Sequence, residues 1–167
     1  MIESVNVPKD RINVIKDEKA KRGIENSVNV KLSFDENTVI IDGEGLDLFT
    51  AKNMVKAIGR GFAPDKAFRL LNEEEVLDVV EIGEESNNLK TIKARLIGTK
   101  GKTRRMIEEF SGASLSIYGK TVSFIGKYEQ LKIAKDAVNM LLKGSKHAKV
   151  YKFLFDVNQD ESAEASV

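Results

Sequence analysis

The sequence predicts an α+β fold made of two tandem units, each with the order strand, helix, helix, strand, strand, helix. Three observations support this prediction. Short alternating strands are followed by helices of apolar period near 3.6, the second half of the chain repeats the first, and a Gly-x-x-Gly turn separates two helices in the second copy. Each unit is expected to form a three-stranded sheet with helices on one face.

The internal repeat has one constant offset of 83 residues. Ile24-Glu25 corresponds to Ile107-Glu108, and Gly61 corresponds to Gly144. Leu32-Ser33, Thr38-Val39, Ala51-Lys52 and Val55 also have counterparts at the same offset, without a gap from residue 24 to residue 61. Two copies of one structural unit explain this pattern.

The first unit is placed at residues 1–83. Its alternating and apolar-periodic segments predict a strand over 4–7, a short helical entry over 9–15, a helix over 16–25, strands over 28–34 and 38–42, a helix over 47–58 and a closing helix over 64–72. Pro64 suits the first turn of that closing helix, which is expected to pack between the two copies. A strand over 76–82 and a polar loop over 83–89 follow.

The second unit is placed at residues 84–152, and residues 153–167 are predicted to be a disordered tail because their composition becomes polar. The unit begins with a helical segment from residue 90. A second helix starts near Gly101, strands follow over 113–117 and 121–125 with a tight turn between them, and a last helix covers 128–143.

The charge is distributed unevenly between the two copies. Residues 1–83 have 12 Lys and Arg and 16 Asp and Glu, a net charge of −4, whereas residues 88–152 have 15 Lys and Arg and four acids, a net charge of +11. Such a surplus on one small unit is typical of a nucleic-acid partner. A basic surface without any ligand is the alternative.

The Gly98-Thr99-Lys100-Gly101 turn is the strongest local signal for a binding site. Glycines permit a tight turn and a close approach of the backbone to a phosphate, and the following helix directs its positive dipole end at that place. A P-loop would also bind phosphate, but its first glycine would have to be residue 96, which is Leu96. A polyanion is therefore the predicted ligand.

Several function classes are excluded by composition. The chain has no cysteine and one histidine, His147, so zinc sites and catalytic triads are not expected. Glu108 and Glu109 are adjacent on a helix and point apart, so they do not form a carboxylate pair. No cofactor, no metal and no enzymatic activity are predicted. No segment approaches membrane-spanning length, and a soluble, cytoplasmic protein is expected.

Four segments make the chain resemble the archaeal two-KH-domain proteins related to the eukaryotic partner-of-Nob protein. They are VPKDR at 7–11, KAIGRGFAPDKAFRLLNE at 56–73, IGTKGKTRRMIEEFSGASLSIYGKTV at 97–122 and GSKHAKVY at 144–151. The resemblance covers nearly the whole chain. It implies two tandem KH domains of βααββα order and a role in assembly of the small ribosomal subunit.

The resemblance also implies where RNA binds. Single-stranded rRNA near the 3′ end of the small-subunit rRNA is the expected partner of the second KH domain. Its Gly-x-x-Gly loop is expected to clamp the nucleotide backbone, and the edge of the strand over 113–117 is expected to read bases. The expected RNA-binding residues are Ile97, Gly98, Thr99, Lys100, Gly101, Lys102, Arg104, Arg105, Ser114, Leu115, Ser116 and Lys120.

Protein partners implied by the resemblance are the endonuclease that matures this rRNA end and the alpha subunit of translation initiation factor two. The first copy departs from the family pattern, because Ile15-Lys16-Asp17-Glu18 replaces its Gly-x-x-Gly. It is predicted to face protein instead of RNA. The alternative function for the whole chain is an interaction adaptor whose KH folds recruit a nuclease or initiation-factor subunit with little RNA affinity.

Overall fold

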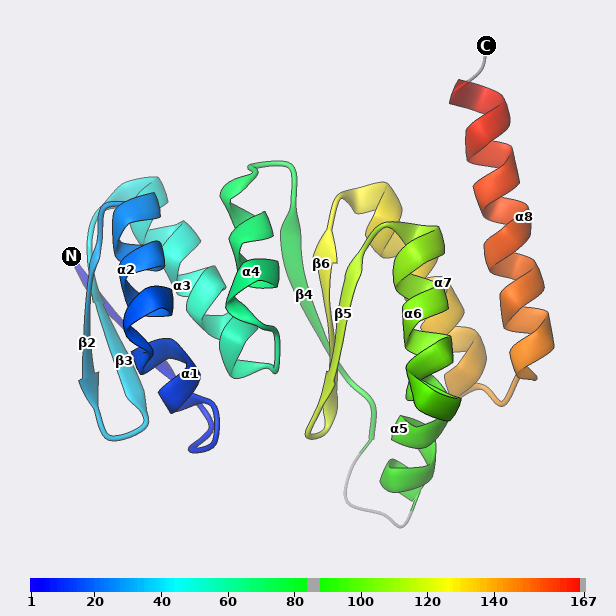
Figure 1. The fold of residues 1–167 in the computed structure, drawn as a ribbon, viewed down its shortest axis with the longest axis horizontal. Helices are drawn as coiled ribbons and strands as arrows, with labels where there is room; N and C mark the ends of the chain where they lie inside the picture. The colour runs from blue at the N-terminus through cyan, green and yellow to red at the C-terminus, as the bar shows by residue number, and fades with distance from the viewer. Residues whose placement is uncertain (84–87, 166–167) are drawn as a thin grey trace. The chain divides into compact units, whose positions relative to one another are not determined.

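The computed structural model describes residues 1–83 and 88–165, and the chain divides into two compact units, Met1–Leu77 and Asp78–Val167. Each unit contains one antiparallel three-stranded sheet and its own helices (Figure 1). The predicted α+β class is therefore confirmed. Of the predicted loop over 83–89, residues 84–87 lie outside the described residues.

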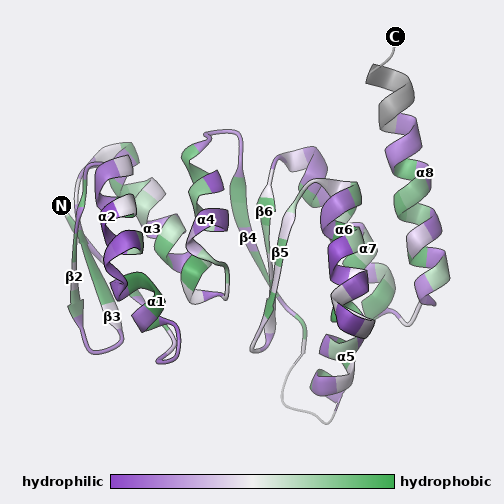
Figure 2. Cartoon of the chain, viewed as in Figure 1, coloured by the Kyte–Doolittle hydropathy of each residue, from purple (hydrophilic) through white to green (hydrophobic). Residues whose placement is uncertain are grey.

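The first unit has strand order β1-β3-β2. Its helices gather on one side of the sheet, and Figure 2 shows how apolar and polar residues alternate around them. The elements are β1 (Ile2–Asn6), α1 (Ile12–Lys16), α2 (Glu18–Ser27), β2 (Lys31–Asp35), β3 (Thr38–Asp42), α3 (Gly45–Gly59), α4 (Pro64–Ala67) and the 3-10 turn η1 (Phe68–Leu71).

The second unit repeats this topology with strand order β4-β6-β5. Its elements are β4 (Val76–Glu81), α5 (Asn88–Ile97), the 3-10 turn η2 (Thr99–Gly101), α6 (Lys102–Ser111), β5 (Ser114–Tyr118), β6 (Thr121–Gly126), α7 (Tyr128–Leu142) and α8 (His147–Ala165). The start of α7 is fixed locally, because the Lys127 backbone N–H donates to Oε1 of Gln130 at 2.9 Å.

The predicted boundary after residue 83 lies too late in the chain. Strand β4 pairs with β6 and so belongs to the second sheet, and the second unit begins at Asp78. The 83-residue offset of the repeat does not extend back to this strand, mainly because the helix before the turn has ten residues in the second unit (α5) and five in the first (α1).

The closing helix predicted over 64–72 is present as α4 followed by η1. Its Phe68 packs inside the first unit: a Cβ on Gly23 of α2 would stand 2.7 Å from Cζ of the Phe68 ring. Gly23 therefore leaves the space that the ring needs. This contact ties the closing segment to α2.

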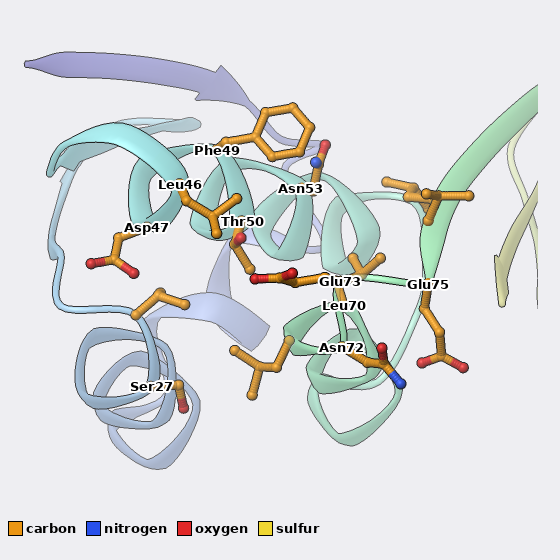
Figure 3. A pocket seen from close by; sticks show the side chains of 14 residues that line it. Ser27, Leu46, Asp47, Phe49, Thr50, Asn53, Leu70, Asn72, Glu73 and Glu75 are labelled. Carbon is orange, nitrogen blue, oxygen red and sulfur yellow. The ribbon is translucent and has the colours of Figure 1, made fainter. Parts of the chain in front are cut away.

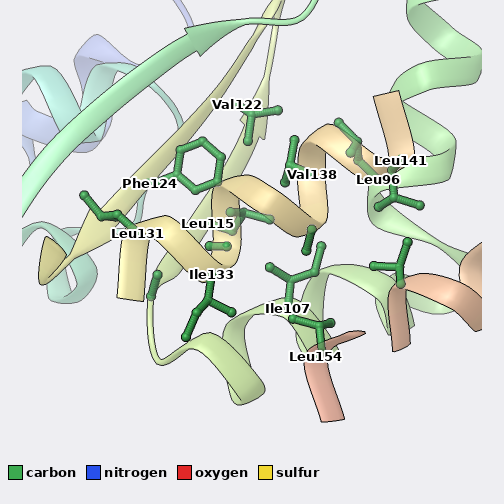
Figure 4. Packing of buried hydrophobic residues seen from close by; sticks show 14 of the residues in the cluster. Leu96, Ile107, Leu115, Val122, Phe124, Leu131, Ile133, Val138, Leu141 and Leu154 are labelled. Carbon is green, nitrogen blue, oxygen red and sulfur yellow. The ribbon is translucent and has the colours of Figure 1, made fainter. Parts of the chain in front are cut away.

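The prediction of a disordered tail after Lys152 is wrong, because α8 extends from His147 to Ala165. Val150 and Leu154, four residues apart on one face of α8, are fully buried in the core of the second unit, and Phe153 and Val157 pack against it. Figure 4 shows Leu154 beside Ile107 in this core. The sequence prediction missed this apolar stripe, because the composition of the segment is dominated by the polar residues around it.

We expect Leu154→Ala to lower the free energy of unfolding of the second unit by about 2–5 kcal/mol, because it removes a fully buried side chain from a packed core. Chemical denaturation measures this. Phe155→Ala is the matched control, since the Phe155 side chain is 52% exposed and its truncation should change the free energy by about 0.5 kcal/mol or less. Equal effects of the two substitutions would contradict the packing of α8.

Candidate nucleic-acid interface

The turn between α5 and α6 has a backbone that depends on glycine. Gly98 has φ 76° and ψ 173°, a region that residues with a Cβ essentially do not adopt, and Lys100 (φ 53°) and Gly101 (φ 76°) are left-handed. A Cβ on Gly98 would also stand 2.1 Å from Oγ1 of Thr103. The Gly101 amide donates to the Gly98 carbonyl oxygen at 3.1 Å and closes the turn.

The start of α6 is open to an anion. Gly101 is its N-cap, no side chain accepts a hydrogen bond there, and the first turn of α6 contains no acidic residue. Thr99, Lys100 and Lys102 are exposed beside this helix end. The positive end of the helix dipole and two ammonium groups thus meet at one exposed turn, which suits a phosphate.

A residue from the C-terminal helix supports this turn. The hydroxyl groups of Thr103 and Tyr151 lie 2.9 Å apart, and Thr103 is buried. Nζ of Lys102 lies 5.4 Å from the centre of the Tyr151 ring. Because Thr103 also contacts Gly98, Tyr151 of α8 holds the turn through this side chain. The motif pattern alone did not reveal this contact, since 48 residues separate its partners.

Hydrogen bonds of Arg95 hold α5 against the end of α7 and the start of α8. The Arg95 guanidinium donates to the carbonyl oxygens of Leu141 at 2.7 Å and Ser145 at 2.5 Å. Nε2 of His147 lies 3.0 Å from the Arg95 carbonyl oxygen. Arg95 and His147 therefore join α5, the end of α7 and the start of α8, and they fix the helix that precedes the glycine turn.

The predicted cationic residues lie on the surface around α6. Lys102, Arg104 and Arg105 are exposed, and Arg104 forms an i,i+4 ion pair with Glu108 at 3.7 Å. Ile97 and Gly98 are half-buried at the end of α5. Lys120 is exposed in the turn between β5 and β6, where its carbonyl oxygen accepts from the Ile82 amide.

The predicted base-reading side chains of β5 are not exposed. Ser114, Leu115 and Ser116 are all buried, and Leu115 is part of the core. The sequence prediction placed base reading at the edge of the strand over 113–117, and the burial of these three side chains leaves the backbone as the exposed part of that edge. Since β5 is at the edge of its sheet, only its backbone edge remains, and there the Leu115 amide already donates to Oε2 of Glu108 at 3.1 Å.

The first unit has the same edge contact but a different helix turn. The Leu32 amide donates to Oε2 of Glu25 at 2.9 Å, which is the equivalent of the Leu115–Glu108 bond. At the turn, Ile15 is fully buried where the second unit has Gly98. Asp17 is the N-cap of α2, and its carboxylate accepts from the Ala20 amide at 3.4 Å. An internal carboxylate therefore occupies the helix end that an anion would need.

Among the described residues, the structure contains no helix with both the length and the apolar character needed to cross a bilayer.

Comparison with known proteins agrees with this geometry. Residues 73–159 match the eukaryotic-type, or type I, KH domain, a range that includes β4 and much of α8. A KH domain-containing protein of Methanocaldococcus jannaschii is 44% identical over 164 residues, which are 92% of this chain and 72% of the relative. The pre-rRNA-processing protein pno1 of Schizosaccharomyces pombe is 32% identical over 104 residues, 59% of this chain and 43% of the relative.

A solved structure is also similar over nearly the whole chain. It is the aDim2p of Pyrococcus horikoshii, crystallised in a complex with a/eIF2alpha and rRNA, with 42% sequence identity and a TM-score of 0.89. The similarity covers 96% of this chain and 95% of that chain.

The Thr103–Tyr151 contact can be tested by removing one hydroxyl. We expect Tyr151→Phe to lower the free energy of unfolding of the second unit by about 1–3 kcal/mol, because the buried Thr103 hydroxyl loses its partner. Urea denaturation measures the change. Tyr128→Phe is the matched control, since Tyr128 is largely exposed and should tolerate the same substitution.

A double-mutant cycle sharpens this test. Thr103→Val together with Tyr151→Phe removes both hydroxyl groups, so it should cost less than the sum of the two single substitutions. Strictly additive costs would show that the two hydroxyl groups do not stabilise each other.

Proposed function

This chain belongs to the partner-of-Nob family of type I KH-domain proteins, and we propose that it binds single-stranded rRNA through the Gly98–Gly101 turn of its second unit. The proposed role is that of an assembly factor for the small ribosomal subunit that binds near the 3′ end of its rRNA. It acts by binding and not as an enzyme. Its place of action is the cytoplasm.

The observation on which this proposal rests is the open helix end at the glycine turn. A KH domain clamps the backbone of about four nucleotides at its Gly-x-x-Gly loop. Here the absence of a Cβ at Gly98 and Gly101 permits the close approach of a phosphate, and no side chain caps α6. Lys100 and Lys102 supply positive charge at the same turn. The phosphate backbone therefore binds by electrostatics, and bases are left to the neighbouring surface.

We propose that the first unit is also a KH-type domain that has lost its RNA clamp. Its order of elements and its strand order equal those of the second unit. The buried Ile15 and the capping carboxylate of Asp17 replace the glycine turn. A phosphate approaching this turn would meet a negative charge, so this unit contributes scaffold and protein contacts instead of a second RNA site.

Protein partners are proposed from the resemblance to the complex with a/eIF2alpha. The alpha subunit of translation initiation factor two and the endonuclease that matures the rRNA end are the two proposed partners. The chain spans 43% of the fission-yeast relative, so the activities of such longer proteins are carried over only as proposals. An adaptor with little RNA affinity is the competing function, favoured by the acidic first unit.

We expect the double substitution Thr99→Asp/Lys100→Asp to weaken binding of single-stranded rRNA at least about tenfold, which is about 1.4 kcal/mol. Two carboxylates would then face the phosphates at an exposed turn, where the fold tolerates them. Fluorescence anisotropy with a labelled 3′-end rRNA fragment measures affinity, and circular dichroism verifies folding.

The control for this variant has the same change of charge at another place. Lys132→Asp/Asn139→Asp alters two exposed residues of α7 and also changes the net charge by −3. Its RNA affinity should stay close to that of the wild type. An equal loss in both variants would mean that total charge, and not the glycine turn, determines binding.

RNA affinity should also fall steeply with salt. If four to six Lys and Arg residues of the second unit contact phosphates, the plot of log K against log salt concentration should have a slope of about −3 to −4 for a single strand. Titrations at several salt concentrations measure it. A flat response would favour the adaptor function.

A further inference from the structure

We propose that the first unit has a docking groove for a basic amphipathic helix of a partner protein. The groove lies between the end of α2, the first turns of α3 and the segment from η1 into β4 (Figure 3). The proposal deepens the protein-facing role proposed for this unit and rests on it. It adds the place of the contact and the chemistry of the partner.

One wall of the groove is formed by residues on a single face of α3. Leu46, Phe49, Thr50 and Asn53 line it from α3, and their spacing of i, i+3, i+4 and i+7 puts them on one face of that helix. The opposite face of α3 is buried in the unit, where Ala51, Met54, Val55 and Ile58 are fully covered. The core of the unit therefore does not need the apolar side chains of Leu46 and Phe49, which lie on the outer face of α3.

The apolar residues of the groove are unusually exposed. Leu46 is 60% exposed, Phe49 63%, Leu71 42% and Val76 50%. These four side chains come from three segments, α3, η1 and the start of β4, and line the same groove. Single exposed apolar residues are ordinary on a protein surface, but a group gathered in one hollow is typical of an interaction site.

The charge of the groove selects the partner. Its lining contains three carboxylates, Asp47, Glu73 and Glu75, and no Lys or Arg. Glu75 forms an ion pair with Arg69 at 2.6 Å. The other two carboxylates, of Asp47 and Glu73, are on exposed side chains. RNA would be repelled here. A peptide that offers Lys or Arg beside an apolar face is complementary to this groove.

The shape of the wall favours a helix as the occupant. The stripe on α3 begins with the exposed apolar Leu46 and Phe49 and continues with the partly buried Thr50 and Asn53, and η1 forms a second wall beside it. An amphipathic helix can place its own apolar face into such a groove. The side chains at the margin of such a helix would then reach Asp47 and Glu73. The expected partner segment thus has apolar residues at helical spacing with Lys or Arg on both sides.

The test uses the full chain and two synthetic probes. One is an amidated helical peptide of about 18 residues with Leu at i, i+3, i+4, i+7 positions and Lys elsewhere, and the other has Glu in place of each Lys. Fluorescence anisotropy measures both affinities, and RNA affinity is measured on every variant in parallel. We expect the Lys peptide to bind at least about tenfold more tightly than the Glu peptide.

Two variants connect this binding to the groove. Phe49→Ser should weaken binding of the Lys peptide at least about tenfold. Phe155→Ser should leave the affinity for this peptide unchanged, because Phe155 is an exposed residue of α8 in the second unit. Glu73→Lys should reduce the preference for the Lys peptide, and Glu81→Lys, outside the groove, should not. RNA affinity should be the same in Phe49→Ser and wild type.

Several outcomes would overturn the proposal. One is equal affinity for the two peptides, and another is an equal effect of Phe49→Ser and Phe155→Ser on peptide affinity. The third is sedimentation that shows a dimer for the wild type and a monomer for Phe49→Ser, because a second copy of the chain would then be the occupant of the groove. Failure of the proposed RNA function would be visible separately, because it would leave peptide binding intact while Thr99→Asp/Lys100→Asp kept its RNA affinity.

Discussion

The glycine turn between α5 and α6 is the constraint around which the second unit is organised. Gly98 has a backbone conformation that essentially excludes other residues, and Thr103 fills the space where its side chain would be. Thr103 in turn meets Tyr151 from α8. A turn with exposed cationic side chains is therefore held by a buried contact, which is how an exposed loop keeps one shape for a ligand.

The two units separate what the fold needs from what phosphate binding needs. Both keep a glutamate that accepts the amide of the edge strand, Glu25 for Leu32 and Glu108 for Leu115, so this bond serves the fold. Only the second unit keeps the glycine turn. The first unit has the buried Ile15 at the position of Gly98 and still forms the same sheet, so this fold does not require the glycine turn.

The surfaces of the two units have opposite chemistry. The turn of the second unit is polar and cationic, which suits a flexible polyanion. The groove of the first unit is apolar and lined by carboxylates, which suits a folded basic segment. The two proposed ligands need surfaces of opposite charge, so neither is expected to bind at the site proposed for the other.

The sequence by itself determined the α+β class, the repeat, the order of the elements and the glycine turn, since these depend on local periodicity and on residue types within a few positions. Tertiary structure decided which sheet β4 joins, because strand pairing is a contact between distant segments. It also showed that α8 is part of the core, that Ser114, Leu115 and Ser116 are buried, and that Tyr151 supports the turn. Burial and long-range hydrogen bonds depend on which surfaces meet, and a linear pattern does not contain that information.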